Sequence, residues 1–294
     1  MMKDKIIINE VGLRECFQKQ EKLYSIEKKL ELLDGLILSG LKHIQLCSFV
    51  SPKILPQMGD AEKFYFSAPK SNNIVYSAFI LNVKGVNRAI SCGINKLETS
   101  ISLDDKYGLT NTGMDYKRSL NELSKIADLA HKNNIKLRIG LQCAWGRKSF
   151  KKNIINLSDK IDKIIAMDPH KICLADTAGL AKPDTIKEYL EVVIPMVKEI
   201  PLVIHLHQTE TNWKENVHVA IDMGIREFDS SLGGEGGSPF LHTSKGNVPT
   251  EELAELIDQK GFYSGVDQSV IKKTALKLYR IVNNIPDDKV VSFN

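Results

Sequence analysis

Cysteine is scarce in this sequence, and its spacing is irregular. Five cysteines lie far apart along the chain, so neither a disulfide framework nor a structural zinc ribbon is indicated. They are Cys16, Cys47, Cys92, Cys143 and Cys173. Unpaired, reduced thiols are typical of the cytoplasm, and we therefore expect a cytoplasmic protein.

Long hydrophobic runs are also lacking. No stretch approaches the ~20 consecutive apolar residues that a membrane-spanning helix needs. Residues 1–5 carry charges, and the apolar run after them is too short for the core of a signal peptide. The sequence therefore predicts neither a membrane segment nor export.

Neither sign of charge dominates. The chain has 40 Lys and Arg residues against 36 Asp and Glu residues, a net charge of +4, and its lysines are interleaved with acidic residues. Because there is no basic block, nucleic-acid binding is not indicated. A hydrophobic content of 43% with 26% charged residues is typical of a soluble globular protein with a sizeable core.

Strand and helix patterns alternate along the chain. Short apolar runs are each followed by a segment with apolar residues at helical spacing. The expected strands are residues 6–11, 43–49, 74–80, 96–101, 135–142, 170–174, 202–206 and 227–230. The expected helices are residues 25–38, 59–66, 83–92, 112–133, 153–167, 183–197, 211–223 and 250–257. Eight such units predict parallel strands in a (β/α)8 barrel.

We predict an α/β fold, a single (β/α)8 TIM barrel over residues 1–294, with two extensions. One is a glycine-rich loop at 232–247, after the eighth strand, where mobile loops of barrel enzymes cover the site. The other is a C-terminal helix at 267–283. The alternative is an open doubly wound sheet, but no G-x-G-x-x-G motif opens a helix after the first strand.

The most informative motif is His205-Leu206-His207, at the end of the seventh expected strand. Residues two apart on a strand point the same way, so both imidazoles face one point in space. That arrangement suits a divalent metal at the C-terminal end of a barrel, where catalytic groups collect. An ordinary pair of polar histidines at a strand end is the alternative.

Other strand ends add oxygen and nitrogen groups to the same region. They contribute Glu10, Arg14, Glu15, Gln45, Ser48, Asp176 and Thr177, and the late loop adds Ser238 and Asn247. A carboxylate, two imidazoles and an amide oxygen suit Mg²⁺ or Mn²⁺. Arg14 beside such a metal would stabilise an enolate oxygen, as cleavage or formation of a carbon–carbon bond beta to a carbonyl requires. A salt bridge with Glu10 or Glu15 is the alternative role of Arg14.

Several segments, in order over almost the whole chain, resemble hydroxymethylglutaryl-CoA lyases. They are residues 9–15 (NEVGLRE), 48–53 (SFVSPK), 55–58 (LPQM), 176–177 (DT), 205–207 (HLH), 230–240 (SSLGGEGGSPF) and 246–247 (GN). The arginine–acid pair and the H-x-H motif are shared with a wider family of metal-dependent barrel enzymes that includes isopropylmalate and homocitrate synthases. The SFVSPK segment and the glycine-rich loop point to the lyase branch.

The resemblance implies a role for each matching position. Glu15, His205, His207 and Asn247 would bind a divalent cation, Mg²⁺ or Mn²⁺ with Zn²⁺ as a further candidate. The expected catalytic residues are Arg14, which would stabilise the enolate, together with Asp176, Ser238 and Gln45. The expected substrate contacts are Gln18, Ser48, Thr177 and Thr209. The implied partner is an acyl-CoA or hydroxy acid substrate, and the implied assembly is a homodimer.

Three positions differ from the lyase pattern. Glu15 stands where the family has Asp, Gln45 where it has Glu, and Ser238 where it has a loop cysteine that acts as acid and base. A serine hydroxyl exchanges protons less readily than a thiol, whose pKa is about 8.5. From the resemblance we expect a lyase for a 3-hydroxyacyl-CoA, and the three departures leave two alternatives. One is a Claisen-type condensing enzyme or aldolase, and the other is a weakly active metabolite-binding barrel.

Overall fold

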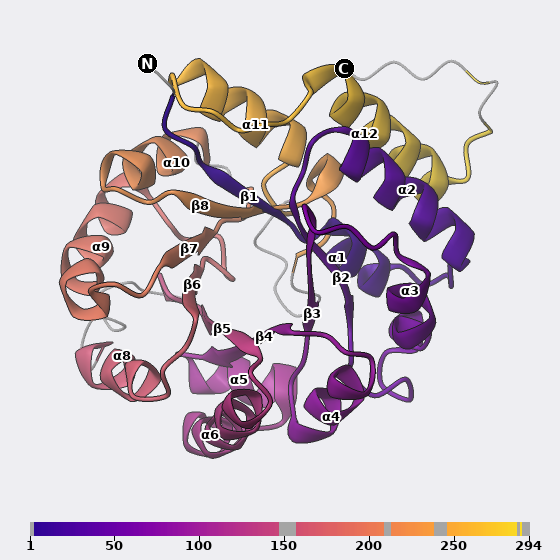
Figure 1. Ribbon diagram of the computed structural model, residues 1–294. Helices are drawn as coiled ribbons and strands as arrows, with labels where there is room; N and C mark the ends of the chain where they lie inside the picture. Colours follow the sequence, from indigo (N-terminus) through magenta and orange to yellow (C-terminus); the bar gives the residue numbers. More distant parts are fainter. Residues whose placement is uncertain (1–2, 147–156, 209–212, 238–245, 287–288, 290–294) are drawn as a thin grey trace.

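The computed structural model describes residues 3–146, 157–208, 213–237, 246–286 and 289. Within them, eight parallel strands pair in chain order, and β8 pairs with β1 to close a barrel (Figure 1). The strands are β1 (Ile7–Glu10), β2 (His43–Ser48), β3 (Val75–Phe79), β4 (Lys96–Ser102), β5 (Lys136–Gln142), β6 (Lys171–Ala175), β7 (Leu202–His205) and β8 (Glu227–Ser230). The predicted barrel is confirmed.

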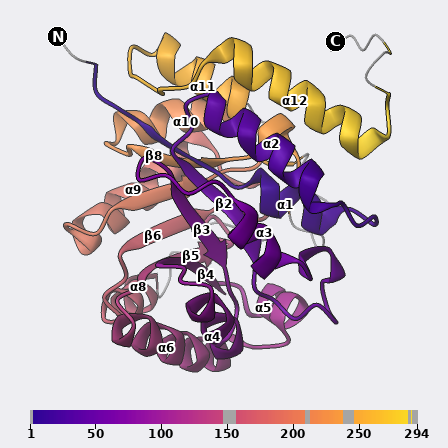
Figure 2. The same cartoon turned by 45° about the vertical axis from the view of Figure 1, so that its right-hand side comes forward.

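Helices surround the barrel and bury their apolar faces against the strands (Figures 1 and 2). The α-helices are α1 (Gly12–Lys19), α2 (Ile26–Leu38), α3 (Ala61–Ser67), α4 (Val83–Ser91), α5 (Asp105–Thr112), α6 (Tyr116–Lys132), α8 (Leu157–Ile165), α9 (Pro183–Val197), α10 (Trp213–Asp222), α11 (Thr250–Gln259) and α12 (Gln268–Asn283). Short 3₁₀ helices η1 (Pro56–Met58) and η2 (Leu232–Gly234) occupy two of the loops.

Two parts of the helix layer differ from the prediction. Helix α1 follows β1 directly and was not expected, because it has only 8 residues and four of them are Arg, Glu, Gln or Lys. The helix expected at 112–133 is α6, which begins at Tyr116, and the separate helix α5 before it was not expected. Gly113, with φ of 72°, ends α5, and Asp115 begins α6 by accepting a hydrogen bond from the Arg118 amide.

The predicted C-terminal helix is confirmed as α12, and it lies along α2 in both views (Figures 1 and 2). The Asp267 side chain caps its first turn by accepting hydrogen bonds from the amides of Ser269 and Val270. The two helices meet at Gly35, where a Cβ atom would lie 2.6 Å from Thr274 Oγ1. A glycine is therefore what allows α12 to approach α2 so closely.

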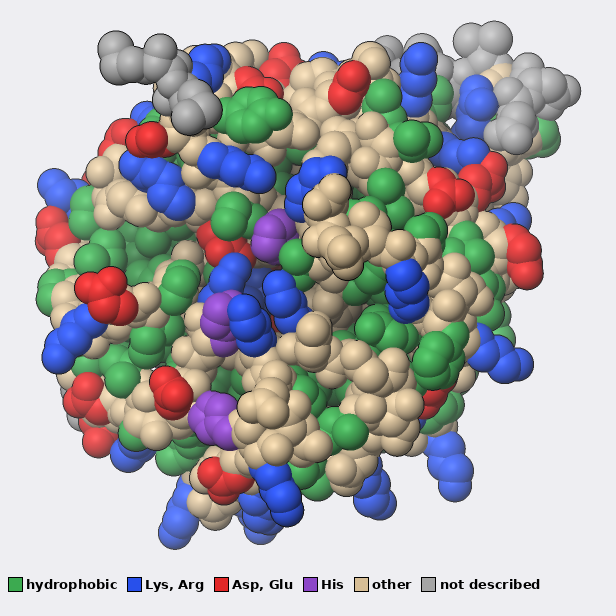
Figure 3. All heavy atoms as spheres, viewed as in Figure 1, with side chains coloured by type: hydrophobic (Ala, Val, Ile, Leu, Met, Phe, Trp, Pro, Cys, Tyr) green, Lys and Arg blue, Asp and Glu red, His purple; other side chains and the backbone are tan. Residues whose placement is uncertain are grey.

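The two ends of the barrel differ in the side chains that they present. The predicted sites lie at the C-terminal ends of the strands. At the N-terminal end, a hollow is lined by His43, Lys96, Lys136, His170 and Lys171, among others. Figure 3 shows Lys, Arg and His side chains gathered near the middle of the face it presents. Among the described helices, none is long and apolar enough to cross a bilayer.

Candidate active site

A cavity of about 310 Å³ opens at the C-terminal ends of the strands. Seven of the predicted site residues line it, namely Arg14, Glu15, Gln18, Ser48, Thr177, His205 and His207. Gln45, Asp176 and Asn247 lie behind that wall and are each almost fully buried. The structure therefore brings ten of the predicted residues together, and Ser238 and Thr209 lie outside the described residues.

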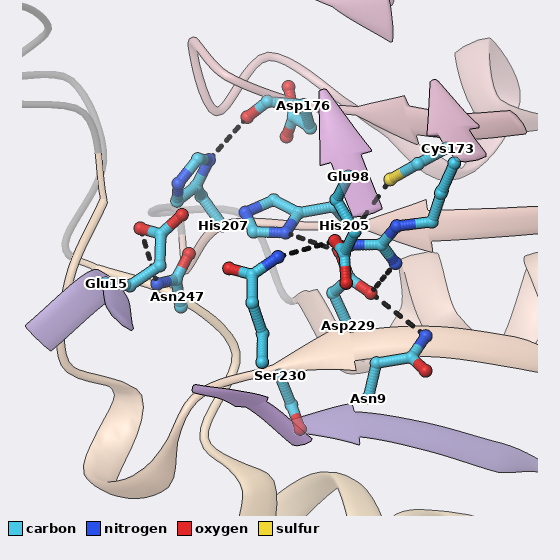
Figure 4. A network of polar contacts seen from close by, with 12 residues as sticks. Asn9, Glu15, Glu98, Cys173, Asp176, His205, His207, Asp229, Ser230 and Asn247 are labelled. Atoms are coloured by element: carbon cyan, nitrogen blue, oxygen red, sulfur yellow. Dashed lines mark hydrogen bonds and ion pairs between the residues drawn. The ribbon is translucent and has the colours of Figure 1, made fainter. Parts of the chain in front are cut away.

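Helix α1 places Arg14 and Glu15 at the mouth of the barrel, each 8% exposed. Arg14 Nη1 and Glu15 Oε1 form an ion pair of 2.6 Å, so the alternative of a salt bridge between them is realised, in a buried setting. Glu15 Oε2 accepts hydrogen bonds from the Gly237 amide at 3.0 Å and from Asn247 Nδ2 at 3.2 Å (Figure 4). These contacts join α1 to the loop after β8.

Gly236 makes that junction possible. Its φ is 105°, a conformation that residues with side chains rarely adopt. A Cβ atom there would lie 2.7 Å from both Glu15 Cβ and Asn247 Nδ2. The lack of a side chain at Gly236 thus lets the backbone of this loop pack directly against the Glu15 side chain.

Glu15 is held in its charged form. Burial alone would raise the pKa of its carboxyl group, but the charges of Arg14 and His205 and the Gly237 amide outweigh burial and lower the pKa to about 2. Glu15 is therefore an anion at neutral pH, as an oxygen ligand for a metal must be.

The two histidines are each fixed through Nδ1. His205 Nδ1 donates to Asp229 Oδ2 at 3.1 Å, and His207 Nδ1 donates to the Asp176 carbonyl at 2.7 Å. Their ring centroids are 5.1 Å apart. Hydrogen bonding through Nδ1 fixes the tautomer and leaves Nε2 of each ring for another partner, as is usual for metal-binding histidines.

The pKa values of the two histidines are shifted in opposite directions. Burial opposes the charged form of both, but the hydrogen bond and charge of Asp229 raise the pKa of His205 above its usual value. His207 has no such carboxylate, so burial and the neighbouring His205 lower its pKa to about 4. His207 is therefore neutral at pH 7, the form in which an imidazole binds metal.

Asn247 has an amide oxygen to spare. Its Nδ2 donates to Glu15 and to the Glu235 carbonyl, whereas its buried Oδ1 has no hydrogen-bond partner in the described parts of the chain. Buried polar atoms are nearly always paired, so this oxygen beside the Glu15 carboxylate is available to a further partner, and its chemistry fits a cation. No three His, Cys, Asp or Glu side chains of the described residues already form a ligand cluster, and Glu15 is engaged by Arg14 instead.

A row of buried charges inside the barrel was not predicted. Glu98 on β4 pairs with Arg138 on β5, and Arg138 Nη1 also contacts Asp229 Oδ1 on β8 at 2.6 Å (Figure 4). Glu98 and Arg138 are direct neighbours in the strand register. The one available signal was a charged residue inside each of three otherwise buried strands, which in parallel sheets are normally apolar.

The remaining polar residues of the site lie in the wall of the cavity or directly behind it. Burial raises the pKa of Asp176 to about 7, although the Leu180 and Ala181 amides bind its Oδ1. Its Oδ2 has no partner among the residues described. Thr177 Oγ1 accepts a hydrogen bond from the Cys143 amide at 2.9 Å. Ser48, 1% exposed, also has a hydroxyl with no described partner.

Comparison with known proteins gives the family. The model of the HMGL-like family matches residues 5–278. The human mitochondrial hydroxymethylglutaryl-CoA lyase is 29% identical over 287 residues, which cover 97% of this chain and 88% of that protein. The lyase of Pseudomonas mevalonii is 26% identical over 270 residues, 92% of this chain and 90% of its own.

Solved structures agree. An HMG-CoA lyase of Acinetobacter baumannii, in complex with coenzyme A and 3-methylmalate, has a TM-score of 0.88 at 27% identity, covering 95% of this chain and 92% of that one. The hydroxymethylglutaryl-CoA lyase of Pseudomonas aeruginosa has the same TM-score at 24% identity, with coverage of 97% and 96%. This barrel, with its arginine–acid pair and paired histidines, belongs to the HMGL-like family.

Proposed function

We propose that the chain is a divalent-metal-dependent carbon–carbon lyase that cleaves a 3-hydroxyacyl-CoA through an enolate, with hydroxymethylglutaryl-CoA as the first substrate to test. The observation that carries the proposal is the gathering of Arg14, Glu15, both histidines and Asn247 at the mouth of the barrel. Membership of the HMGL-like family supports the same class of reaction.

The donor set fits a divalent cation. Glu15 would offer a carboxylate oxygen, Asn247 its orphaned Oδ1, and His205 and His207 their Nε2 atoms. Mixed nitrogen and oxygen ligands of this kind suit Mg²⁺ or Mn²⁺, and Zn²⁺ is a further candidate. When bound, the cation would polarise oxygen atoms of the substrate as a Lewis acid.

Arg14 would stabilise the charge that develops when the bond breaks. Its guanidinium lies 4.9 Å above the Phe79 ring and, as a group that only donates hydrogen bonds, presents fixed N–H donors. Loss of the proton from the C3 hydroxyl and cleavage of the C2–C3 bond release acetoacetate from hydroxymethylglutaryl-CoA and leave the enolate of acetyl-CoA. Donors already in place for the enolate oxygen lower the barrier without reorganisation.

Asp176 is our candidate for holding a proton. With a pKa of about 7, its carboxyl group can both accept and release a proton near neutral pH. Because it lies behind His207 and not in the cavity wall, it would exchange protons with the substrate through water. Ser238, in the position of the family's loop cysteine, is the second candidate.

A second substrate class is favoured by the apolar flank of the cavity. Val50, Ile54, Leu55, Phe79 and Leu81 line one side of it. Such a wall suits an alkyl group, and the Acinetobacter relative was solved with coenzyme A and 3-methylmalate. The same chemistry on a different hydroxy acid, in the cleaving or the condensing direction, is therefore the alternative to hydroxymethylglutaryl-CoA.

The decisive experiment is an assay of the purified protein with Mg²⁺ or Mn²⁺ and hydroxymethylglutaryl-CoA, following release of acetoacetate, with EDTA as a control. We expect metal-dependent cleavage that Arg14→Gln abolishes. If Mn²⁺ binds but nothing is cleaved, the alternative substrates are tested next in both directions. If no divalent cation binds, the proposal is wrong and the metabolite-binding alternative gains support. The implied homodimer is checked by light scattering.

A further inference from the structure

Gln45 is the link between Arg14 and the charges inside the barrel. Arg14 Nε donates to Gln45 Oε1 at 2.5 Å, and Gln45 Nε2 donates to Glu98 Oε2 at 2.5 Å. Gln45 is 1% exposed, so its amide group is shielded from bulk solvent. One side chain of β2 therefore connects the guanidinium at the mouth of the barrel to a carboxylate on β4.

The amide of Gln45 has one allowed orientation. A carboxylate accepts hydrogen bonds and a guanidinium only donates them, so the amide must turn its NH₂ to Glu98 and its oxygen to Arg14. The reverse orientation would set N–H against N–H and oxygen against oxygen. Leaving buried polar groups unsatisfied is unfavourable, so Glu98 fixes the direction of the Gln45 amide, and Gln45 in turn fixes Arg14 Nε.

Glu98 is itself held firmly. Its Oε2 also pairs with Arg138, and its Oε1 accepts a hydrogen bond from Ser77 Oγ at 2.5 Å. The carboxyl group is thus contacted from β2, β3 and β5, and it cannot swing away from Gln45 without breaking a buried ion pair.

We propose that Glu98 is a positioning residue that orients Arg14 through Gln45. A carboxylate on β4, one side chain further into the barrel than Gln45, thereby sets the orientation of the guanidinium at the mouth. The inference rests on the proposed function of Arg14 in stabilising an enolate. A simpler role, in which Glu98 only neutralises Arg138, is what the experiments must separate from it.

Three variants make that separation. In Glu98→Gln, the amide at position 98 no longer dictates the orientation of Gln45, and we expect kcat to fall about 100-fold with KM little changed, as for a misplaced catalytic group. In Gln45→Glu, two carboxylates meet at hydrogen-bond distance, and we expect a loss at least as large. In the double variant Gln45→Glu/Glu98→Gln, the new carboxylate on β2 would accept directly from Arg14 and from the new amide on β4. We expect its kcat to lie within about tenfold of the wild type.

The double variant distinguishes the two roles. If Glu98 only neutralises Arg138, moving its negative charge to position 45 restores nothing, and the double variant stays as slow as Glu98→Gln. That result, or a Glu98→Gln variant with full kcat, would overturn the proposal. Thermal unfolding of each variant shows whether a loss of activity is a loss of fold.

A second measurement needs no turnover. The Nε–Hε resonance of Arg14 in an NMR spectrum, assigned by its loss in Arg14→Lys, reports the hydrogen bond to Gln45 directly. We expect it to shift and exchange faster with water in Glu98→Gln. Ser77→Ala is the matched control, because it removes a bond to Oε1 of Glu98 and leaves the path through Oε2 intact.

The two readouts also separate the two proposals. If the wild type cleaves no substrate but the Arg14 resonance responds to Glu98→Gln and not to Ser77→Ala, the proposed function fails and the positioning role stands. If the wild type is active and the resonance is the same in all variants, the positioning role fails alone.

Discussion

Arg14 and Glu15, neighbours in the sequence, hold each other in an ion pair of 2.6 Å between Nη1 and Oε1, at the point where a metal and an enolate would meet. One partner is our candidate for charge stabilisation and the other for metal binding. Replacing either therefore affects the two functions differently, and the pair is the best place to test the proposed chemistry.

Arg14→Gln is expected to separate catalysis from metal binding. The variant loses the charged donors for the enolate oxygen, and we expect kcat to fall by at least about 100-fold. Glu15 loses its ion-pair partner but stays buried beside Gly237 and Asn247, so Mn²⁺ affinity should be kept or increased. Steady-state kinetics and Mn²⁺ titration by electron paramagnetic resonance measure both. A variant with full turnover would show that Arg14 has no part in the reaction.

Asp229→Asn is expected to weaken metal binding although it replaces none of the proposed metal ligands. Asp229 orients His205 through Nδ1, and loss of such a partner commonly lowers metal affinity about 10–100-fold. Glu227→Gln is the matched control, because Glu227 is buried on the same strand but pairs with Lys171 and Asn9. Equal Mn²⁺ dissociation constants for the two variants would contradict a role of His205 as a ligand.

Ser238→Cys tests the departure in the late loop. A thiol near its pKa of about 8.5 exchanges protons far more readily at neutral pH than a hydroxyl does. If Ser238 takes the part of the family's loop cysteine, the variant should cleave hydroxymethylglutaryl-CoA several-fold faster than the wild type, whereas Ser238→Ala should not. Equal rates in all three proteins would show that proton transfer by this side chain does not limit turnover.

The sequence was sufficient to predict the barrel and the ends of its strands. Apolar runs and helical spacing mark each β/α unit locally, and parallel strands bring their C-terminal ends to one mouth. His207 and Asp176 could therefore be placed together, although they lie 31 positions apart in the sequence. Helix α1 was missed because its eight residues, about two turns, are too few for a helical spacing of apolar residues to stand out in the sequence.

The buried charges could not be predicted in the same way. Glu98 and Arg138 lie 40 residues apart, and only the register of β4 on β5 makes them neighbours. The ion pair of Asp229 with Arg138 depends on closure of the barrel, because only then do side chains of β8 and β5 meet inside it. No local pattern carries that information, so the connection from Gln45 to Glu98 becomes visible only in three dimensions.

The free energy of unfolding is expected to fall as pH rises towards 7, because the Glu10 carboxyl group loses its proton. Burial raises the pKa of its carboxyl group from 4.5 to about 7, although Thr250, Leu232 and Gly12 donate hydrogen bonds to it. The folded protein therefore holds a proton that the unfolded chain releases above about pH 4.5. The resulting stability is complete below that pH and is lost as pH rises through about 7, a change of about 3 kcal/mol.

Glu10→Gln should remove this part of the pH dependence. A neutral amide keeps an oxygen for the Gly12 and Leu232 amides, so we expect the variant to fold. Urea unfolding at pH 5 and pH 8 measures the free energy of unfolding for both proteins. The wild type should lose more stability between the two values than the variant. Identical losses would mean that Glu10 does not titrate in this range.

Gly35→Ala is expected to destabilise the protein, against the usual trend. In most helices alanine is favoured over glycine by about 1 kcal/mol. In α2, however, the new Cβ atom would lie 2.6 Å from Thr274 Oγ1 and 2.7 Å from Thr274 Cγ2, and such overpacking typically costs about 1–3 kcal/mol. We therefore expect a lower Tm and faster amide exchange in α12.

The double variant Gly35→Ala/Thr274→Ala supplies the test of that explanation. Among the described residues, the Thr274 hydroxyl bonds only the Val270 carbonyl of its own helix, so its removal leaves no distant described partner unpaired. Without Oγ1 and Cγ2, the helix propensity of alanine should prevail, and the double variant should be at least as stable as Thr274→Ala alone. If Gly35→Ala is equally harmful in both backgrounds, the two residues are not in contact, and α12 does not lie on α2 as the structure has it.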